Sequence, residues 1–147
     1  MRTLNALSIV LVKEQGLKIV SLFSGATLTE TSFMDSLKSL RENNIGLANS
    51  SLMEALKSGK QANEDDLPLL IFAYIKSAIE IGKLEFAQSA IGKIVSELGE
   101  DYDQLLHPFK IAINYMQTGD VEILERLQQE EREIVQEIVK LRDSKQS

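Results

Sequence analysis

The chain has 147 residues and a mass of 16.4 kDa, the usual size of one compact domain that buries a core without disulfides or bound metal. Hydrophobic residues make up 44% and charged residues 26%, values near the globular average that exclude a disordered or fibrous protein. The net charge of -6 and the pI near 4.9 argue against general binding to nucleic-acid backbones or anionic lipid. The absence of cysteine and the single histidine, His107, remove most metal and redox chemistry.

The acidic character belongs to the second half of the chain. Residues 1–60 carry seven basic and five acidic residues, whereas residues 61–147 carry nine basic and 17 acidic residues. No apolar run reaches the roughly 18 residues that span a bilayer, because Lys13, Glu14 and Lys18 interrupt the apolar N-terminus. We therefore expect no membrane span and a cytoplasmic location.

The first 25 residues leave two interpretations open. Residues 13–16 suit the turn of a small β-hairpin, and the segments on either side are rich in β-branched residues: Ile9, Val10, Val12, Ile19 and Val20. A helix that is broken at Gly16 fits the same residues. Because two isolated strands are marginally stable and every later segment has a helical pattern, we expect a helix here as well.

Two helices are predicted between residues 28 and 59. Thr27 with Glu30, and Ser51 with Glu54, have the spacing of a capping box, in which a hydroxyl and a carboxylate satisfy free amides at a helix start. The expected ends are marked by asparagine and glycine: Asn43, Asn44 and Gly46 for the first helix and Gly59 for the second. We expect one domain spanning residues 1–147. The polar segment 60–67 is its best linker, and any subdivision would separate residues 1–60 from residues 67–147.

The segment from residue 67 to Ile81 is expected to be the central core helix. Asp65 or Asp66 can cap it, and Pro68 suits its first turn. Apolar residues lie on nearly every face of this segment, which is typical of a helix that is buried on all sides. Gly82 ends it, and the next helix has an apolar stripe that ends at Gly99.

Two further helices are predicted towards the C-terminus. Asp101 with Gln104 has the capping-box spacing, and the helix that follows is expected to end at Gly119. From Asp120 one long helix is expected to run to about Arg142. Its apolar residues are spaced in threes and fours like a heptad seam: Leu124, Leu127, Ile134, Ile138 and Leu141.

A repeat of 37 residues relates the later helices to one another. Aligning Gly82 with Gly119 places Phe72 over Phe109. Each unit is then a helix, a tight glycine turn and a second helix, the pattern of stacked helical hairpins. We predict an all-α fold of about six or seven helices, in which antiparallel hairpins stack as a short solenoid or bundle.

The segment 71–98 resembles a tetratricopeptide-type helical repeat, and the segment 108–142 is similar to a second copy. The residues that match the family pattern are Gly82, Leu84, Ala87, Ile91 and Ile94 in the first copy and Ala112, Tyr115 and Gly119 in the second. The resemblance implies a protein-binding scaffold without catalysis that holds peptides or partner helices in a groove. An ordinary antiparallel helical bundle explains the same helix, turn and helix pattern.

Motifs for catalysis and cofactor binding are missing from the sequence. It contains neither a Gly-rich phosphate loop nor a dinucleotide fingerprint. His107 has no carboxylate or histidine at helical metal spacing, and a catalytic role would require Asp101 or Asp103 as its partner in the fold. The acidic clusters at residues 64–66 and 97–103 precede predicted helices and are best explained as helix-start charge. We therefore predict no catalytic residue, no metal site and no cofactor.

The candidate interface combines the last helix with two tyrosines. The apolar face of that helix is wider than one neighbour needs, so an exposed face would be an association site, whereas a buried one would cover the core helix. The tyrosines lie within apolar stripes and suit a groove or the core. The candidate residues are Ile134, Val135, Ile138, Val139, Leu141, Tyr74 and Tyr115.

The sequence favours a non-catalytic interaction, scaffold or adaptor module that binds a protein partner or a second copy through its C-terminal helix. The alternative is a small transcriptional regulator, in which residues 27–47 form a helix-turn-helix-like unit and the acidic second half is a sensor or dimerisation part. Only Lys38 and Arg41 would lie on its recognition helix, which is few for phosphate contacts and disfavours nucleic acid as a partner. An enzyme is the least favoured class, because no nucleophile, base and orienting group can be named together.

Overall fold

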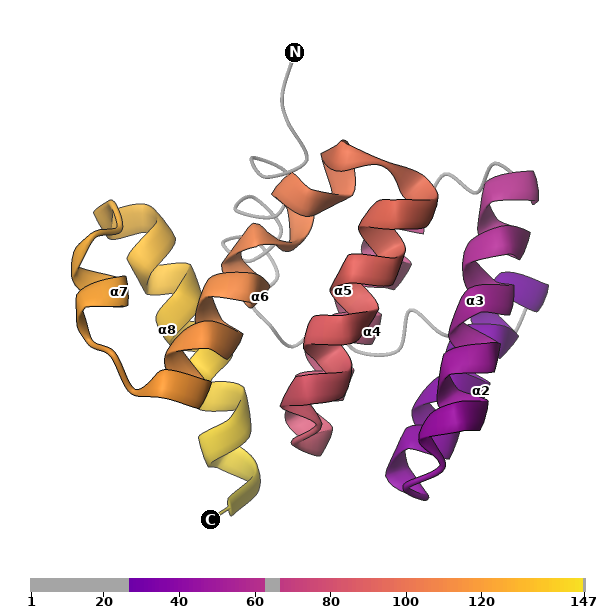
Figure 1. Ribbon diagram of the computed structural model, residues 1–147, viewed down its shortest axis with the longest axis horizontal. Helices are drawn as coiled ribbons and strands as arrows, with labels where there is room; N and C mark the ends of the chain where they lie inside the picture. The colour runs from indigo at the N-terminus through magenta and orange to yellow at the C-terminus, as the bar shows by residue number, and fades with distance from the viewer. Residues whose placement is uncertain (1–26, 63–66, 147) are drawn as a thin grey trace.

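Seven helices make up the part of the chain that the structure, a computed structural model, describes, and that part contains no strand (Figure 1). It comprises residues 27–62 and 67–146, with side chains described as far as residue 141. The helices are α2 (Leu28–Arg41), α3 (Ile45–Ala62), α4 (Leu67–Ile81), α5 (Leu84–Leu98), α6 (Glu100–Thr118), α7 (Glu122–Glu125) and α8 (Gln129–Gln146). The all-α prediction is confirmed. The alternatives for residues 1–25 and the capping of the core helix by Asp65 or Asp66 lie outside the described residues.

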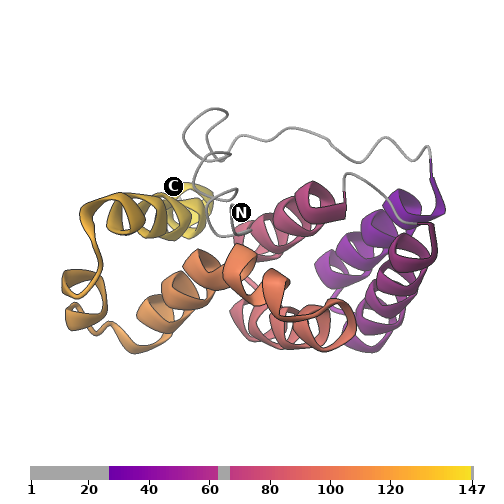
Figure 2. The same cartoon turned by 90° about the horizontal axis from the view of Figure 1, so that it is seen from above.

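The long helices form two layers. Figure 2 shows α2, α4 and α8 in one layer and α3, α5 and α6 in the other, with α4 in contact with helices of both. The chain alternates between the layers from α2 to α5 and then enters α6 without changing layer. As a result α5 and α6 lie side by side, and α8 returns the chain to the layer of α4.

In the first hairpin, the sequence patterns predicted the start of α2 correctly and misplaced the start of α3. The Thr27 hydroxyl accepts a hydrogen bond from the Glu30 amide at 3.1 Å, so this predicted cap is confirmed. The second helix begins at Ile45, where the side chain of Asn44 accepts from the Leu47 amide at 3.1 Å. The predicted start at Ser51 is therefore wrong, because Asn44 in the turn after α2 already supplies a cap about two turns earlier.

The end of α3 also differs from the prediction. This helix continues through Gly59 to Ala62. A Cβ atom at position 59 would lie 2.7 Å from Leu67 Cδ1 and 3.3 Å from Thr29 Cγ2. The glycine therefore marks a close approach between the start of α4, α2 and α3 rather than a helix end.

The core is centred on α4, as the sequence predicts. Phe72 packs edge-on against Phe109 of α6 with ring centroids 4.8 Å apart, and Tyr74 packs against Phe33 of α2 at 5.2 Å. Ile71 and Ile75 are also fully buried. Burial of this many large apolar side chains on one helix supplies much of the hydrophobic free energy that holds the two layers together.

The start of α6 and the course of the last helix need correction. Gly99, with φ 107°, precedes α6, and no side-chain cap is formed by Asp101. The expected single helix from Asp120 is instead divided into α7 and α8. At the break the guanidinium of Arg132 donates to the carbonyl oxygens of Leu124 at 2.9 Å and Leu127 at 2.9 Å, which the amides of a continuous helix would otherwise use.

Candidate functional site

The predicted interface on the last helix lies mainly in the core. Ile134, Val135 and Ile138 are buried between α8 and its neighbours α4 and α6, and Val139 and Leu141 are partly buried against the same core. The wide apolar face of α8 therefore covers the core helix in this structure. A partner could reach the three buried side chains only if α8 moved away.

Tyr74 is a core residue rather than part of a groove. Its hydroxyl lies 2.7 Å from the Ser36 hydroxyl, which in turn donates to the Ala48 carbonyl at 2.6 Å. Burial raises the pKa of the Tyr74 phenol well above its ordinary value, and the hydrogen bond with Ser36 offsets that rise only in part. Tyr115 is partly exposed on α6. The structure does not bring the two tyrosines together in one groove.

His107 is paired, but with neither of the two carboxylates that the sequence suggested. Its Nε2 atom lies 3.4 Å from Oε1 of Glu131 on α8, and the two side chains are 47% and 25% exposed. Asp103 instead accepts from Lys110 at 2.7 Å. This contact joins α8 to α6, and it is an ion pair only when the imidazole is protonated.

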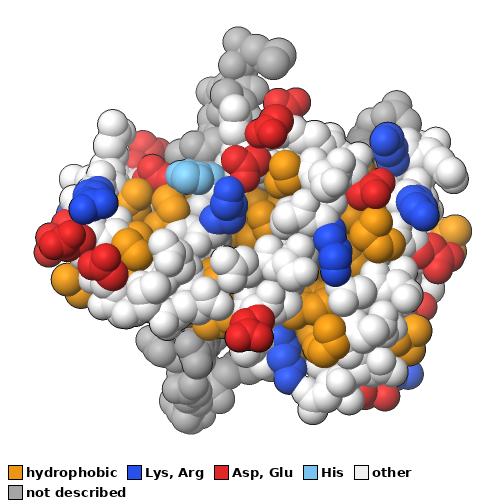
Figure 3. All heavy atoms as spheres, viewed as in Figure 1, with side chains coloured by type: hydrophobic (Ala, Val, Ile, Leu, Met, Phe, Trp, Pro, Cys, Tyr) orange, Lys and Arg blue, Asp and Glu red, His pale blue; other side chains and the backbone are white. Residues whose placement is uncertain are grey.

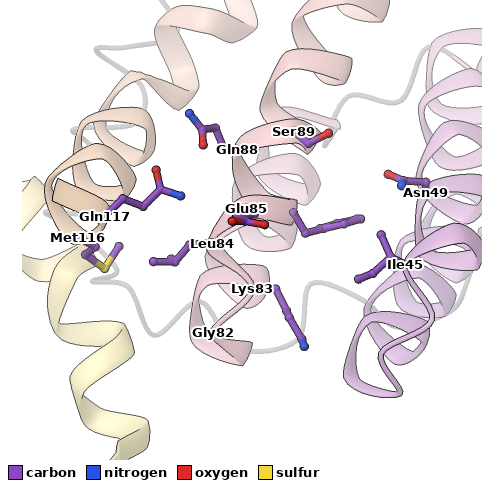
Figure 4. A pocket seen from close by; sticks show the side chains of 11 residues that line it. Ile45, Asn49, Gly82, Lys83, Leu84, Glu85, Gln88, Ser89, Met116 and Gln117 are labelled. Carbon is purple, nitrogen blue, oxygen red and sulfur yellow. The ribbon is translucent and has the colours of Figure 1, made fainter.

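Three hollows lie on the outer face of the layer that contains α3, α5 and α6. The first is about 1170 Å³ in volume and lies between the N-terminal ends of α3 and α5 and the C-terminal end of α6 (Figure 4). A second, of about 680 Å³, follows α3. A third, of about 610 Å³, lies between α5 and α6. Asn49 borders the first and second and Gln88 the first and third, so the three form one continuous surface, named here the α3–α5–α6 face.

Apolar, neutral polar and charged side chains are mixed over this face. The charged or titratable ones are Glu54, Lys57, Lys83, Glu85, Asp103, His107 and Lys110. Space-filling Figure 3 shows apolar atoms interspersed with polar ones across it. The apolar side chains include Ile45, Met53, Ile91 and Met116, and the amide side chains include Asn49, Gln61, Gln88, Asn114 and Gln117. Figure 4 shows Gln88 and Gln117 on the α5 and α6 side of the first hollow and Asn49 on the opposite side. Primary amides both donate and accept hydrogen bonds, so this lining suits a ligand with many uncharged polar groups.

Lysines bridge the boundary between α3 and α5 at the edge of this surface. Lys93 donates to Asn49 Oδ1 at 2.5 Å, and Lys83 donates to Asn43 Oδ1. In the reverse sense, Lys60 of α3 donates to the Glu97 carbonyl of α5 at 3.4 Å. These contacts join the first hairpin to α5.

The first hairpin does not have the geometry of a DNA-reading unit. Figure 1 shows α2 and α3 running antiparallel along each other, whereas the helices of a helix-turn-helix cross at about 90–120°. Lys38 and Arg41 are exposed in the last turn of α2. Acidic residues equal the basic ones in number over residues 27–62, so this hairpin offers no basic stripe.

Within the described ranges no cluster of three or more His, Asp or Glu side chains is placed to hold a metal ion. None of the helices described is long and apolar enough to cross a membrane. Comparisons of the chain with protein-family models, with curated proteins and with solved structures find no match.

The residues of the α3–α5–α6 face were missed by the sequence analysis. The wide apolar stripes that suggest a binding surface in the sequence form the core in the structure. Amides such as Gln88 and Asn114 look like ordinary solvent-facing residues of separate helices in the sequence. One signal was available in the sequence: these amides lie opposite the apolar stripes of two consecutive helices, α5 and α6. The two polar faces form a shared surface only if both helices lie in one layer.

Proposed function

We propose that the protein is a non-catalytic interaction module that binds a segment of a partner protein on the α3–α5–α6 face. The observation that carries the proposal is the continuity of the three hollows across three helices of one layer, joined at Asn49 and Gln88. The resemblance to tetratricopeptide-type repeats supports the same class of function. The cysteine-free composition fits a reducing compartment, so we place the module in the cytoplasm.

The lining of the face favours a peptide segment over a strongly charged ligand. An extended peptide carries unpaired backbone amides and carbonyls, which the row of Asn and Gln side chains can satisfy. The apolar positions between them can receive alternate side chains of such a segment. Charged groups at the site are partly neutralised by one another, as Lys110 is by Asp103, so affinity is expected to depend weakly on salt.

The proposal is tested by selecting peptides from a random library displayed on phage and measuring their affinity for the purified chain by fluorescence anisotropy. The variant Gln88→Trp fills the junction of two hollows and should weaken binding of the selected peptides at least tenfold. The matched control is Gln136→Trp on α8, which makes the same exposed change in the other layer and should leave the affinity unchanged.

Three results would contradict the proposal. The first is the absence of any selected peptide with a Kd below about 100 μM. The second is equal binding by wild type and Gln88→Trp while circular dichroism shows both to be folded. The third is chemical-shift mapping of a bound peptide to α8 alone, which would place the binding surface in the other layer.

A further inference from the structure

The middle of α5 carries a glycine that no contact within the described part of the chain requires. Gly92 is exposed, and α5 continues without a break from Leu84 to Leu98, so this glycine does not mark a helix end. A Cβ atom at position 92 would lie in open space, with no neighbouring side chain or segment within 4 Å, and the backbone there is not in the left-handed region. A glycine inside a helix lowers stability relative to alanine. The packing of the described helices therefore does not explain this destabilising residue.

Gly92 lines the third hollow, between α5 and α6. Apolar side chains of both helices line the same hollow, among them Ile91, Val95 and Ile111. Because position 92 has no side chain, a ligand in this hollow can approach the α5 backbone more closely than alanine or any larger residue would allow. Glycine is the residue that proteins use where a ligand comes close to the main chain. A ligand bound in the third hollow would therefore give this glycine a function.

The polar groups of the third hollow indicate which kind of ligand fits. Each charged or titratable side chain that lines it already has a partner within the chain: Asp103 with Lys110 at 2.7 Å and His107 with Glu131 at 3.4 Å. By contrast, the side-chain amides of Gln88 and Asn114 form no hydrogen bond with any described residue. A primary amide both donates and accepts. The hollow therefore offers hydrogen bonds to a ligand that carries uncharged donors and acceptors.

We propose that the partner segment bound on the α3–α5–α6 face crosses α5 at Gly92 in an extended conformation. Its main chain lies in van der Waals contact with this glycine and exchanges hydrogen bonds with the amides of Gln88 and Asn114. An extended main chain offers free amides and carbonyls along its length, whereas a helix uses its own internally. This inference rests on the proposed function and adds the conformation of the ligand and the point at which it touches α5.

The test uses the full-length chain and the peptide of highest affinity from the phage selection. Gly92→Ala should weaken binding at least fivefold, because the added methyl group holds the peptide main chain away from α5. The same variant should raise the urea concentration at the midpoint of unfolding, since alanine favours the helix and meets no other atom. Gly92→Leu should weaken binding at least fiftyfold. A purely structural role of Gly92 would not lower affinity while stability rises.

Gly46 on α3 is the matched control position. A Cβ atom at position 46 also lies in open space, but Gly46 lines none of the three hollows. Gly46→Ala and Gly46→Leu therefore make the same chemical changes away from the third hollow. Both should leave the affinity for the peptide within twofold of wild type, and circular dichroism checks that all four variants are folded.

A scan of the peptide main chain gives an independent measurement. Each N–H of the peptide is replaced in turn by an N-methyl group, which removes a donor and adds bulk to the main chain. At least one position should lose tenfold or more in affinity for wild type, and the bound peptide should show the NMR coupling constants of an extended chain.

Two results would overturn this inference alone. One is equal affinity of wild type and Gly92→Leu while Gln88→Trp still weakens binding, and the other is a peptide that binds this face as a helix. In both cases the proposed function stands, because a peptide still binds the α3–α5–α6 face. If the selection yields no binding peptide, the proposed function fails and this inference fails with it.

Discussion

The hydroxyl oxygens of Tyr74 and Ser36 lie 2.7 Å apart in the core between α2 and α4. Ser36 also donates to the Ala48 carbonyl of α3, so Tyr74 is the donor to Ser36 and this short chain of hydrogen bonds joins three helices. Both side chains are fully buried. The tyrosine that the sequence suggested for a groove therefore fixes the position of the first hairpin on the core helix.

The variant Tyr74→Phe should lower the free energy of unfolding by about 1 kcal/mol, because it removes one buried hydrogen bond and keeps the ring. Urea denaturation followed by circular dichroism measures this change. Ser36→Ala should cost at least as much, since the Tyr74 hydroxyl is then left without that partner. A double variant whose loss equals the sum of the two single losses would show that the two hydroxyls are not coupled.

The same tyrosine predicts how stability depends on alkaline pH. Burial raises the pKa of Tyr74 above the unfolded value of about 10. The neutral phenol therefore stabilises the fold fully below pH 10, and this contribution is lost as the pH rises further, because the unfolded chain ionises first. Wild type should lose up to about 1.4 kcal/mol per pH unit above 10 relative to Tyr74→Phe. Urea titrations at pH 8.5 and 11 measure the difference, and parallel losses in the two proteins would contradict it.

Ile138 distinguishes a core role of α8 from an interface role. Ile138→Ala should lower the free energy of unfolding by about 2–5 kcal/mol, because a fully buried side chain leaves a cavity. Ile138→Glu should unfold the chain. Lys140→Ala, on the exposed face of the same helix, should change stability by less than about 0.5 kcal/mol. A folded, monomeric Ile138→Glu in light scattering, from a wild type that is dimeric, would return α8 to the role of an interface.

Arg132 should be required for the break between α7 and α8. Arg132→Lys keeps the charge but replaces two separate donor atoms, Nε to Leu124 and Nη2 to Glu125 and Leu127, with one ammonium nitrogen that cannot stand in both places, so it should cost about 1–2 kcal/mol. Amide exchange in residues 122–128 should become faster. Arg126→Lys is the control, because its pair with Glu122 is largely exposed and should contribute little. Equal amide exchange rates for residues 122–128 in the two variants would show that Arg132 is not required for the break.

Gly92 in the middle of α5 should be a site of easy stabilisation. No atom lies within 4 Å of the position of an added Cβ, and its φ is not in the left-handed region. Gly92→Ala should therefore raise the free energy of unfolding by about 0.5–1 kcal/mol. Gly82→Ala should have the opposite effect and cost about 1–2 kcal/mol, because Gly82 has φ +89°. Thermal denaturation of both variants tests whether Gly92→Ala raises and Gly82→Ala lowers the stability of the fold.

Local patterns in the sequence were sufficient for most of the fold. The apolar segment from residue 67 to Ile81 is the mostly buried helix α4, because a helix with apolar residues on nearly every face leaves little of its surface to solvent. Gly82, Gly99 and Gly119 mark helix ends because each has a positive φ. Thr27 caps α2 because its hydroxyl reaches the first-turn amides. These features depend on residues within one or two turns of each other.

Tertiary contacts decided what those local patterns left open. The break before α8 depends on the reach of Arg132 to carbonyls five to eight residues earlier. Gly59 serves as a close-approach position inside α3 because Leu67 of another helix packs where a Cβ atom would lie. The α3–α5–α6 face exists because α5 and α6 lie in one layer. The spacing of apolar residues in a helix does not indicate which layer that helix joins. The sequence by itself determined which residues form helices and which faces are apolar, whereas only packing between distant segments decided which of those faces are buried and which polar side chains share a surface.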